Sequence, residues 1–202
     1  MNKTTRGESD YYWSVILENK KSGGKSVMDK LSYSKKHPIK SIIIIEVSFL
    51  LLVFIAGAIA TIKQLSYNSP ILIAFIPTAL VLIIYFTWKK KWSYYGFKLE
   101  ITRINWTPYI PLLIILTVLC FQGFSSQSFE TIVFYVGFAI LVGFVEESIY
   151  RGIMIKILLP LGILPAILTS SILFSVTHML NLLSGQSMVQ TGLQLAYSFL
   201  IG

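Results

Sequence analysis

The chain has 202 residues, of which 54% are apolar and only 13% are charged. Soluble domains average about 45–50% apolar and about 25% charged residues, so this composition excludes an ordinary water-soluble protein and indicates one surrounded by membrane lipids. The net charge of +8 does not require nucleic acid, because nine of the 17 basic residues lie in the first 40 positions, beside the first apolar segment. We therefore expect a multi-pass protein of the cell membrane that binds no nucleic acid.

Residues 1–40 are polar and basic without a sustained hydrophobic period, which predicts a flexible cytoplasmic tail. Residues 41–104 hold two apolar segments, 42–62 and 71–88, each long enough to cross a bilayer as a helix. Glu46 lies near the start of the first segment, where we expect its side chain to reach the interface. A basic loop at 89–103 follows the second segment, and its Trp and Tyr residues suit a belt at the lipid headgroups. The positive-inside rule places this loop in the cytoplasm with the tail.

The rest of the chain, residues 105–202, is predicted to form a transmembrane core. Its apolar runs lie at about 109–121, 131–159, 163–183 and 188–202. The last run is still apolar at Gly202 and is shorter than a bilayer crossing, so we expect the chain to be a fragment or a truncated relative of a longer protein. The predicted fold class is all-α, a polytopic transmembrane helical bundle of about five spans plus a truncated sixth.

The fourth and fifth spans contain ionisable residues, each of which costs about 2.5–3.5 kcal/mol to insert into a membrane. They are Glu146, Glu147, Arg151 and His178. Glu147 and Arg151 are four residues apart, so an α-helix places them on one side and allows them to pair. Glu146 faces another direction and is left as a free acid that could serve as a general base.

His178 lies four residues after Phe174, on the same helix face. An imidazole, the Glu146 carboxylate and a water molecule are sufficient parts for hydrolysis. The same groups could instead bind a divalent metal such as zinc, although two carboxylates and one histidine are an incomplete set. Because Cys120 is the only cysteine, a disulfide and a cysteine-based zinc site are excluded within this sequence.

Less specific interpretations compete with these. Taken alone, Glu-Glu-x-x-x-Arg occurs by chance in many soluble helices, and a lone histidine is more often a packing residue than a catalyst. Their position inside apolar spans favours function for Glu146 and His178. For Asn181 the two interpretations are even, and His37 is predicted to be solvated. Three neighbours of the charged residues are predicted to serve in packing only, namely Tyr150, Phe174 and Met179.

The order Glu146-Glu147-x-x-x-Arg151 followed by Phe174-x-x-x-His178, on successive apolar segments, resembles the CPBP or Abi family. This family comprises CAAX proteases and bacteriocin-processing membrane proteins. The resemblance covers about residues 105–202.

The resemblance implies an intramembrane endopeptidase whose substrate is a peptide or protein, either a prenylated protein or a bacteriocin precursor. It also implies that Glu146 activates water, that Glu147 pairs with Arg151 and that His178 assists. A third family motif, a histidine followed four residues later by Asn or Asp, does not occur in the printed sequence. The resemblance leaves both a metal-dependent mechanism and a metal-free glutamate mechanism open.

The leading hypothesis is therefore a CAAX-type intramembrane protease with the catalytic residues named above. The alternative is a non-proteolytic membrane protein that serves in bacteriocin immunity or as a protein scaffold. A proton-coupled transporter, in which the same acids form a relay, is the least favoured hypothesis because the sequence contains no evident repeat.

Overall fold

A computed structural model describes residues 33–66, 68–97, 128–183 and 185–202, with isolated positions between 107 and 118. All regular structure in these residues is helical, which confirms the all-α class. The described helices and turns are α3 (Tyr33–Lys36), α4 (Pro38–Ile62), α5 (Ser69–Trp88), α7 (Phe129–Glu146), η3 (Glu147–Met154), α8 (Ile155–Leu158), η4 (Leu159–Leu161), α9 (Ile163–Thr177), η5 (His178–Leu182) and α10 (Met188–Ile201).

Four described helical stretches are long and apolar enough to cross a membrane, which supports a multi-pass membrane protein. They are Pro38–Ile62, Ser69–Trp88, Phe129–Leu161 and Ile163–Leu182. They correspond to the first, second, fourth and fifth predicted spans. Most of the predicted span at 109–121 and most of the predicted tail at 1–40 lie outside the described residues. Residues 33–40 of that tail are described and are mostly helical: they contain α3, and α4 begins at Pro38.

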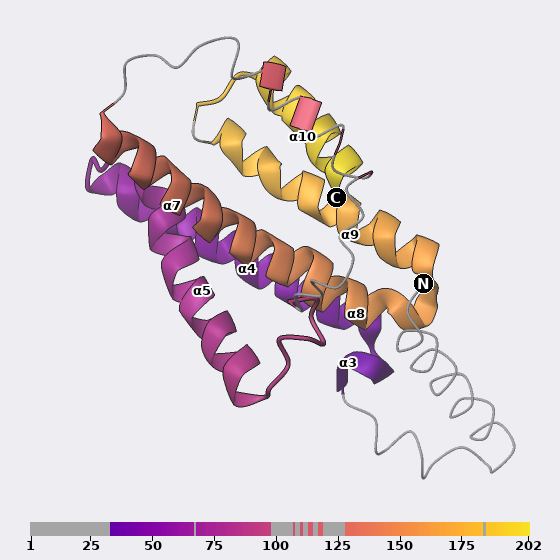
Figure 1. The fold of residues 1–202 in the computed structure, drawn as a ribbon. Coiled ribbons are helices and arrows are strands. Elements are labelled where there is room, and N and C mark those ends of the chain that lie inside the picture. Colours follow the sequence, from indigo (N-terminus) through magenta and orange to yellow (C-terminus); the bar gives the residue numbers. More distant parts are fainter. Residues whose placement is uncertain are drawn as a thin grey trace, which may run out of the picture.

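The helices pack around the long stretch Phe129–Leu161, which runs through the middle of the molecule (Figure 1). On one side α5 packs against both α4 and α7, and on the other α9 packs against η3 and α8, with α10 covering α9. The outer faces are rich in exposed Ile, Leu, Val and Phe side chains, as expected for surfaces that face lipid. Small residues such as Ala56, Ala74 and Ala166 are buried where the helices meet.

A tight turn joins α4 to α5. Gln64 follows the helix end with a φ of 51°, in the left-handed region that favours glycine. The Leu65 amide donates to the Ala60 carbonyl at 2.9 Å, and the Gln64 amide donates to Thr61 at 3.2 Å. This pair of bonds is a Schellman motif, which ends α4 and turns the chain back along the bundle.

The loop after α5 packs inward. The Tyr95 ring stacks on Phe86, which is fully buried, at a centroid distance of 4.8 Å, and Trp92 contacts Phe86 edge-on at 5.4 Å. Burial raises the pKa of the Tyr95 hydroxyl, which lies 3.3 Å from the Tyr85 hydroxyl. These rings were predicted to suit a headgroup belt, but at least Trp92 and Tyr95 cover the end of the helical core.

The central helix changes its hydrogen-bonding pattern in the middle. Residues 147–154 form a π-helix, in which an amide bonds the carbonyl five residues earlier; the Ile155 amide, at its end, donates to Tyr150. Ordinary α geometry was predicted for these residues, and that prediction was wrong. Short π segments inside α-helices are frequent at functional sites. Pro160 then stops the run as predicted, in the η4 turn, and Gly162 with a φ of 117° starts α9.

Candidate functional site

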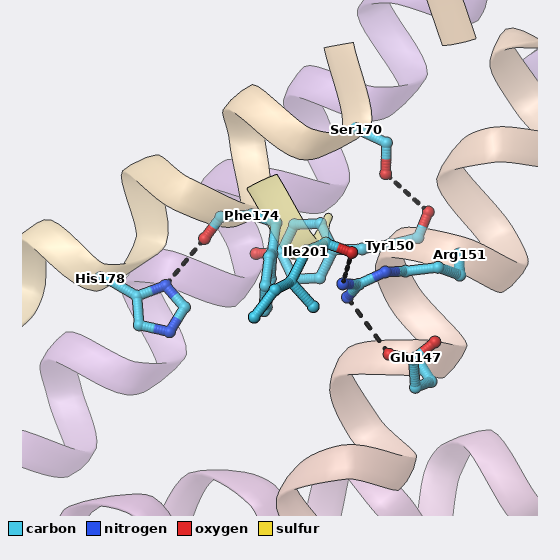
Figure 2. A network of polar contacts seen from close by, with 7 residues as sticks. All are labelled: Glu147, Tyr150, Arg151, Ser170, Phe174, His178 and Ile201. Carbon is cyan, nitrogen blue, oxygen red and sulfur yellow. Dashed lines mark hydrogen bonds and ion pairs between the residues drawn. The ribbon is translucent and has the colours of Figure 1, made fainter. Parts of the chain in front are cut away.

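The predicted site residues come from two neighbouring segments. Glu146 is the last residue of α7, Glu147 and Arg151 belong to η3, and His178 is the first residue after α9. Because α9 packs against η3, the two motifs are brought to the same part of the bundle. Figure 2 shows how the side chains of both segments approach one another.

Glu147 and Arg151 form the predicted ion pair. Their Oε1 and Nη1 atoms are 3.4 Å apart, and the side chains are 56% and 21% exposed respectively. Nη1 makes no well-aligned hydrogen bond within the described residues, so this contact is an ion pair of modest strength. The other terminal nitrogen, Nη2, donates to the Ile201 carbonyl at 3.2 Å (Figure 2). Arg151 therefore joins its own helix to α10.

The Phe174 ring connects the two motifs. The Arg151 guanidinium lies over its face at 4.3 Å from the centroid. The rings of Tyr150 and His178 contact it edge-on, with centroid distances of 5.1 and 5.0 Å. Phe174 is buried, so the prediction that it serves in packing is confirmed, but what it packs against is the charged motif itself.

The His178 ring is oriented by its own helix. Its Nδ1 atom lies 2.9 Å from the Phe174 carbonyl oxygen (Figure 2). A carbonyl can only accept, so Nδ1 must carry the hydrogen and donate it. In the neutral ring this leaves Nε2 as a hydrogen-bond acceptor.

Glu146 is half-buried. Among the described residues its carboxylate takes part in no hydrogen bond or ion pair, and no direct contact joins it to His178. The arrangement thus contains one acid without a fixed partner and one imidazole nitrogen able to accept, on neighbouring segments.

Comparison with known families decides what these motifs resemble. Residues 128–202 match the family model described as type II CAAX prenyl endopeptidase Rce1-like. The predicted resemblance is confirmed over these residues. No curated protein and no solved structure matches the chain. The Rce1-like segment contains α7 to α10 and therefore every predicted site residue.

The prediction for Glu46, which lies outside the Rce1-like segment, was wrong. Glu46 was predicted to reach the interface, but it is only 5% exposed and faces the bundle. The Tyr150 hydroxyl donates to its Oε2 at 3.2 Å, and the Thr177 hydroxyl lies 3.4 Å from its Oε1. The partners come from η3 and α9, so only the tertiary structure shows why this carboxyl turns inward.

The remaining predictions concern residues at the edge of the site. The Asn181 amide donates to Gln194 Oε1 at 2.9 Å and so ties η5 to α10, which favours its structural interpretation. Tyr150 is buried as predicted. Met179 is 48% exposed and is therefore not part of the buried core. His37 is exposed, as predicted.

The described residues do not by themselves form a metal centre. No three His, Cys, Asp or Glu side chains within the described ranges lie close enough together to hold an ion. Zinc sites in proteins take three or four such ligands.

Proposed function

We propose that this chain is an intramembrane endopeptidase of the CAAX type, in which Glu146 activates the attacking water. The observation that carries the proposal is the meeting of the two motifs around Phe174 within the segment that matches the Rce1-like family. The substrate is then a peptide or protein that enters from the membrane, with a prenylated protein as the class that the family name suggests.

The roles follow from hydrogen-bonding capacity. A water molecule between Glu146 and His178 gives one hydrogen to the Glu146 carboxylate and directs the other to Nε2 of His178. A lone pair of the water oxygen is then free to attack the peptide carbonyl. Glu146 takes the proton as the new bond forms and returns it to the leaving amine when the peptide bond breaks. His178 orients the water, because its hydrogen on Nδ1 is already donated to Phe174.

Glu147 and Arg151 act around this step. Arg151 stacks on Phe174 and bonds the Ile201 carbonyl, so it holds α9 and α10 against the π-helix. The Glu147 carboxylate offsets the positive charge of Arg151. We assign both residues to positioning the site.

The test is Glu146→Gln in the whole protein, reconstituted in lipid vesicles and assayed with a prenylated peptide that ends in a CAAX sequence. Loss of a general base typically lowers the rate by about 10²–10⁴-fold, and we expect a fall of this size. Glu130→Gln is the matched control, because Glu130 is an exposed acid in the first turn of α7, far from the motif in sequence. Unchanged turnover in Glu146→Gln would contradict the role proposed for Glu146. A wild type that cleaves no peptide would favour the non-proteolytic alternative of immunity or scaffolding.

A further inference from the structure

The buried carboxyl of Glu46 forms a three-residue polar cluster with two hydroxyl groups. Tyr150 reaches its Oε2 at 3.2 Å and Thr177 reaches its Oε1 at 3.4 Å. The two hydroxyl oxygens are themselves 2.6 Å apart. Each member of this cluster comes from a different helix, namely α4, η3 and α9.

Stability alone does not account for an acid at this position. The rest of the middle of α4 is apolar, and a carboxyl inside a membrane span is costly to insert. Replacing a buried polar group by an apolar one is often neutral for stability when the groups that it contacted keep other hydrogen bonds. Both hydroxyls have such contacts: Thr177 can donate its single hydrogen to the Leu173 carbonyl at 2.9 Å, and Tyr150 can donate its own to the Thr177 oxygen at 2.6 Å.

The cluster adjoins both halves of the candidate site. Tyr150 directly precedes Arg151 in the π-helix, and its carbonyl accepts a hydrogen bond from Ser170 at 2.8 Å (Figure 2). Thr177 directly precedes His178. Glu46 is thus the member of the cluster that ties Tyr150 and Thr177 to the first span, α4.

We propose that Glu46 is a positioning residue for the peptidase site. Its carboxyl holds Tyr150 and Thr177, and through them it sets the position of residues 146–151 relative to His178. The inference rests on the proposed function. It assigns to the first span, which lies outside the segment matched by the Rce1-like family, a direct part in forming the site.

Two substitutions at Glu46 separate positioning from simple packing. Glu46→Gln keeps an oxygen that accepts from Tyr150, whereas Glu46→Met keeps the length of the side chain without any hydrogen bond. A misplacement of about 1 Å at the reacting groups can lower the rate about 100-fold. We expect such a fall in kcat for Glu46→Met, with KM unchanged within about two-fold and with an unfolding temperature equal to or above that of the wild type. We expect Glu46→Gln to retain a kcat close to that of the wild type, because its amide oxygen still accepts from Tyr150.

The His178 ring gives a readout that does not depend on turnover. Diethyl pyrocarbonate modifies neutral imidazole nitrogens, and mass spectrometry of the resulting peptides measures the rate at His178 separately. We expect Glu46→Met to change this rate several-fold and Glu46→Gln to leave it unchanged. The exposed His37 is the internal control, since its rate should be the same in all variants.

Each result has a defined meaning. Wild-type kcat and an unchanged His178 rate in Glu46→Met would overturn the inference, as would a parallel loss of kcat and unfolding temperature in both variants. If Glu146→Gln is inactive while Glu46→Met is fully active, this inference fails and the proposed function stands. If Glu146→Gln retains wild-type turnover, or no peptide is cleaved by the wild type, the proposed function fails and the His178 rate alone decides the position of the ring.

Discussion

The guanidinium carbon of Arg151 lies 4.3 Å from the centroid of the Phe174 ring, so the two motifs of the family resemblance touch directly. The guanidinium lies over the ring while its Nη2 atom donates to the Ile201 carbonyl at 3.2 Å. A lysine ammonium in its place would keep the charge, but it lacks the plane and the forked donors. Arginine is therefore required here for its shape as well as its charge.

Arg151→Met and Phe174→Leu should each destabilise the protein, and their effects should not add. A cation over an aromatic ring contributes about 0.5–1 kcal/mol when exposed and about 2 kcal/mol when desolvated. With Arg151 mostly buried, we expect a coupling energy of about 1–2 kcal/mol in the double-mutant cycle. Unfolding in detergent measures it, and strict additivity would show that the stacking is not an energetic contact.

Two buried serines near the π-helix should respond in opposite ways to alanine. Ser170 donates to the Tyr150 carbonyl at 2.8 Å, so Ser170→Ala should cost about 1 kcal/mol of unfolding free energy. The hydroxyl of Ser148 has no partner among the described residues, so Ser148→Ala removes an unsatisfied group and should be neutral or stabilising. Thermal unfolding of the two variants measures this difference. Equal losses of unfolding free energy would contradict the hydrogen bond from Ser170 to Tyr150.

Gly152 allows the aromatic loop to approach the π-helix. A Cβ at this position would lie 3.3 Å from the Tyr95 carbonyl oxygen, which is a tight contact with backbone. We expect Gly152→Val to cost about 1–3 kcal/mol and to increase cleavage by trypsin at the neighbouring Lys89–Lys91. Gly143→Ala is the control, because an added Cβ there meets nothing within 4 Å and should stabilise the helix by about 0.5–1 kcal/mol. Equal trypsin sensitivity of the Gly152 variant and the wild type would contradict this packing.

The turn after α4 should improve with glycine. Gln64 adopts a φ of 51°, a conformation that costs a residue with a Cβ about 1–2 kcal/mol. Glycine removes this strain but loses more backbone entropy on folding, so Gln64→Gly should stabilise by about 0.5–1 kcal/mol. Gln64→Val should destabilise, since a β-branched residue fits this region poorly. A decrease in unfolding temperature for Gln64→Gly would contradict the Schellman geometry.

Residues whose environment is set within one helix could be predicted from the sequence. The first, second, fourth and fifth spans follow from the length of their apolar runs, and the Glu147–Arg151 pair follows from spacing four residues apart. The motif order was enough to indicate the family that matches residues 128–202.

Features that depend on contacts between distant helices could not be predicted. Glu46 is far from Tyr150 and Thr177 in the sequence, so nothing near it in the chain indicates that it turns inward. The π-helix has no compositional signal, and Trp92 and Tyr95 have the composition of an interfacial belt although they pack against Phe86. A single acid in an otherwise apolar span is the one signal that could have raised the question of Glu46.

The π-helix also decides where the central span tolerates a deletion. A π segment holds about one residue more than the α-helical turns that it replaces, so removing one residue from 147–154 would let it return to α geometry while the helix on either side keeps its orientation. Removing one residue from α7 would instead rotate the part of the helix before the deletion by about 100° relative to Glu146, although the span shortens by only about 1.5 Å and still crosses the membrane. The lipid therefore restricts the length of this span less than the packing restricts the rotational phase of its residues, and the π-helix is the described part of it where losing one residue leaves that phase intact.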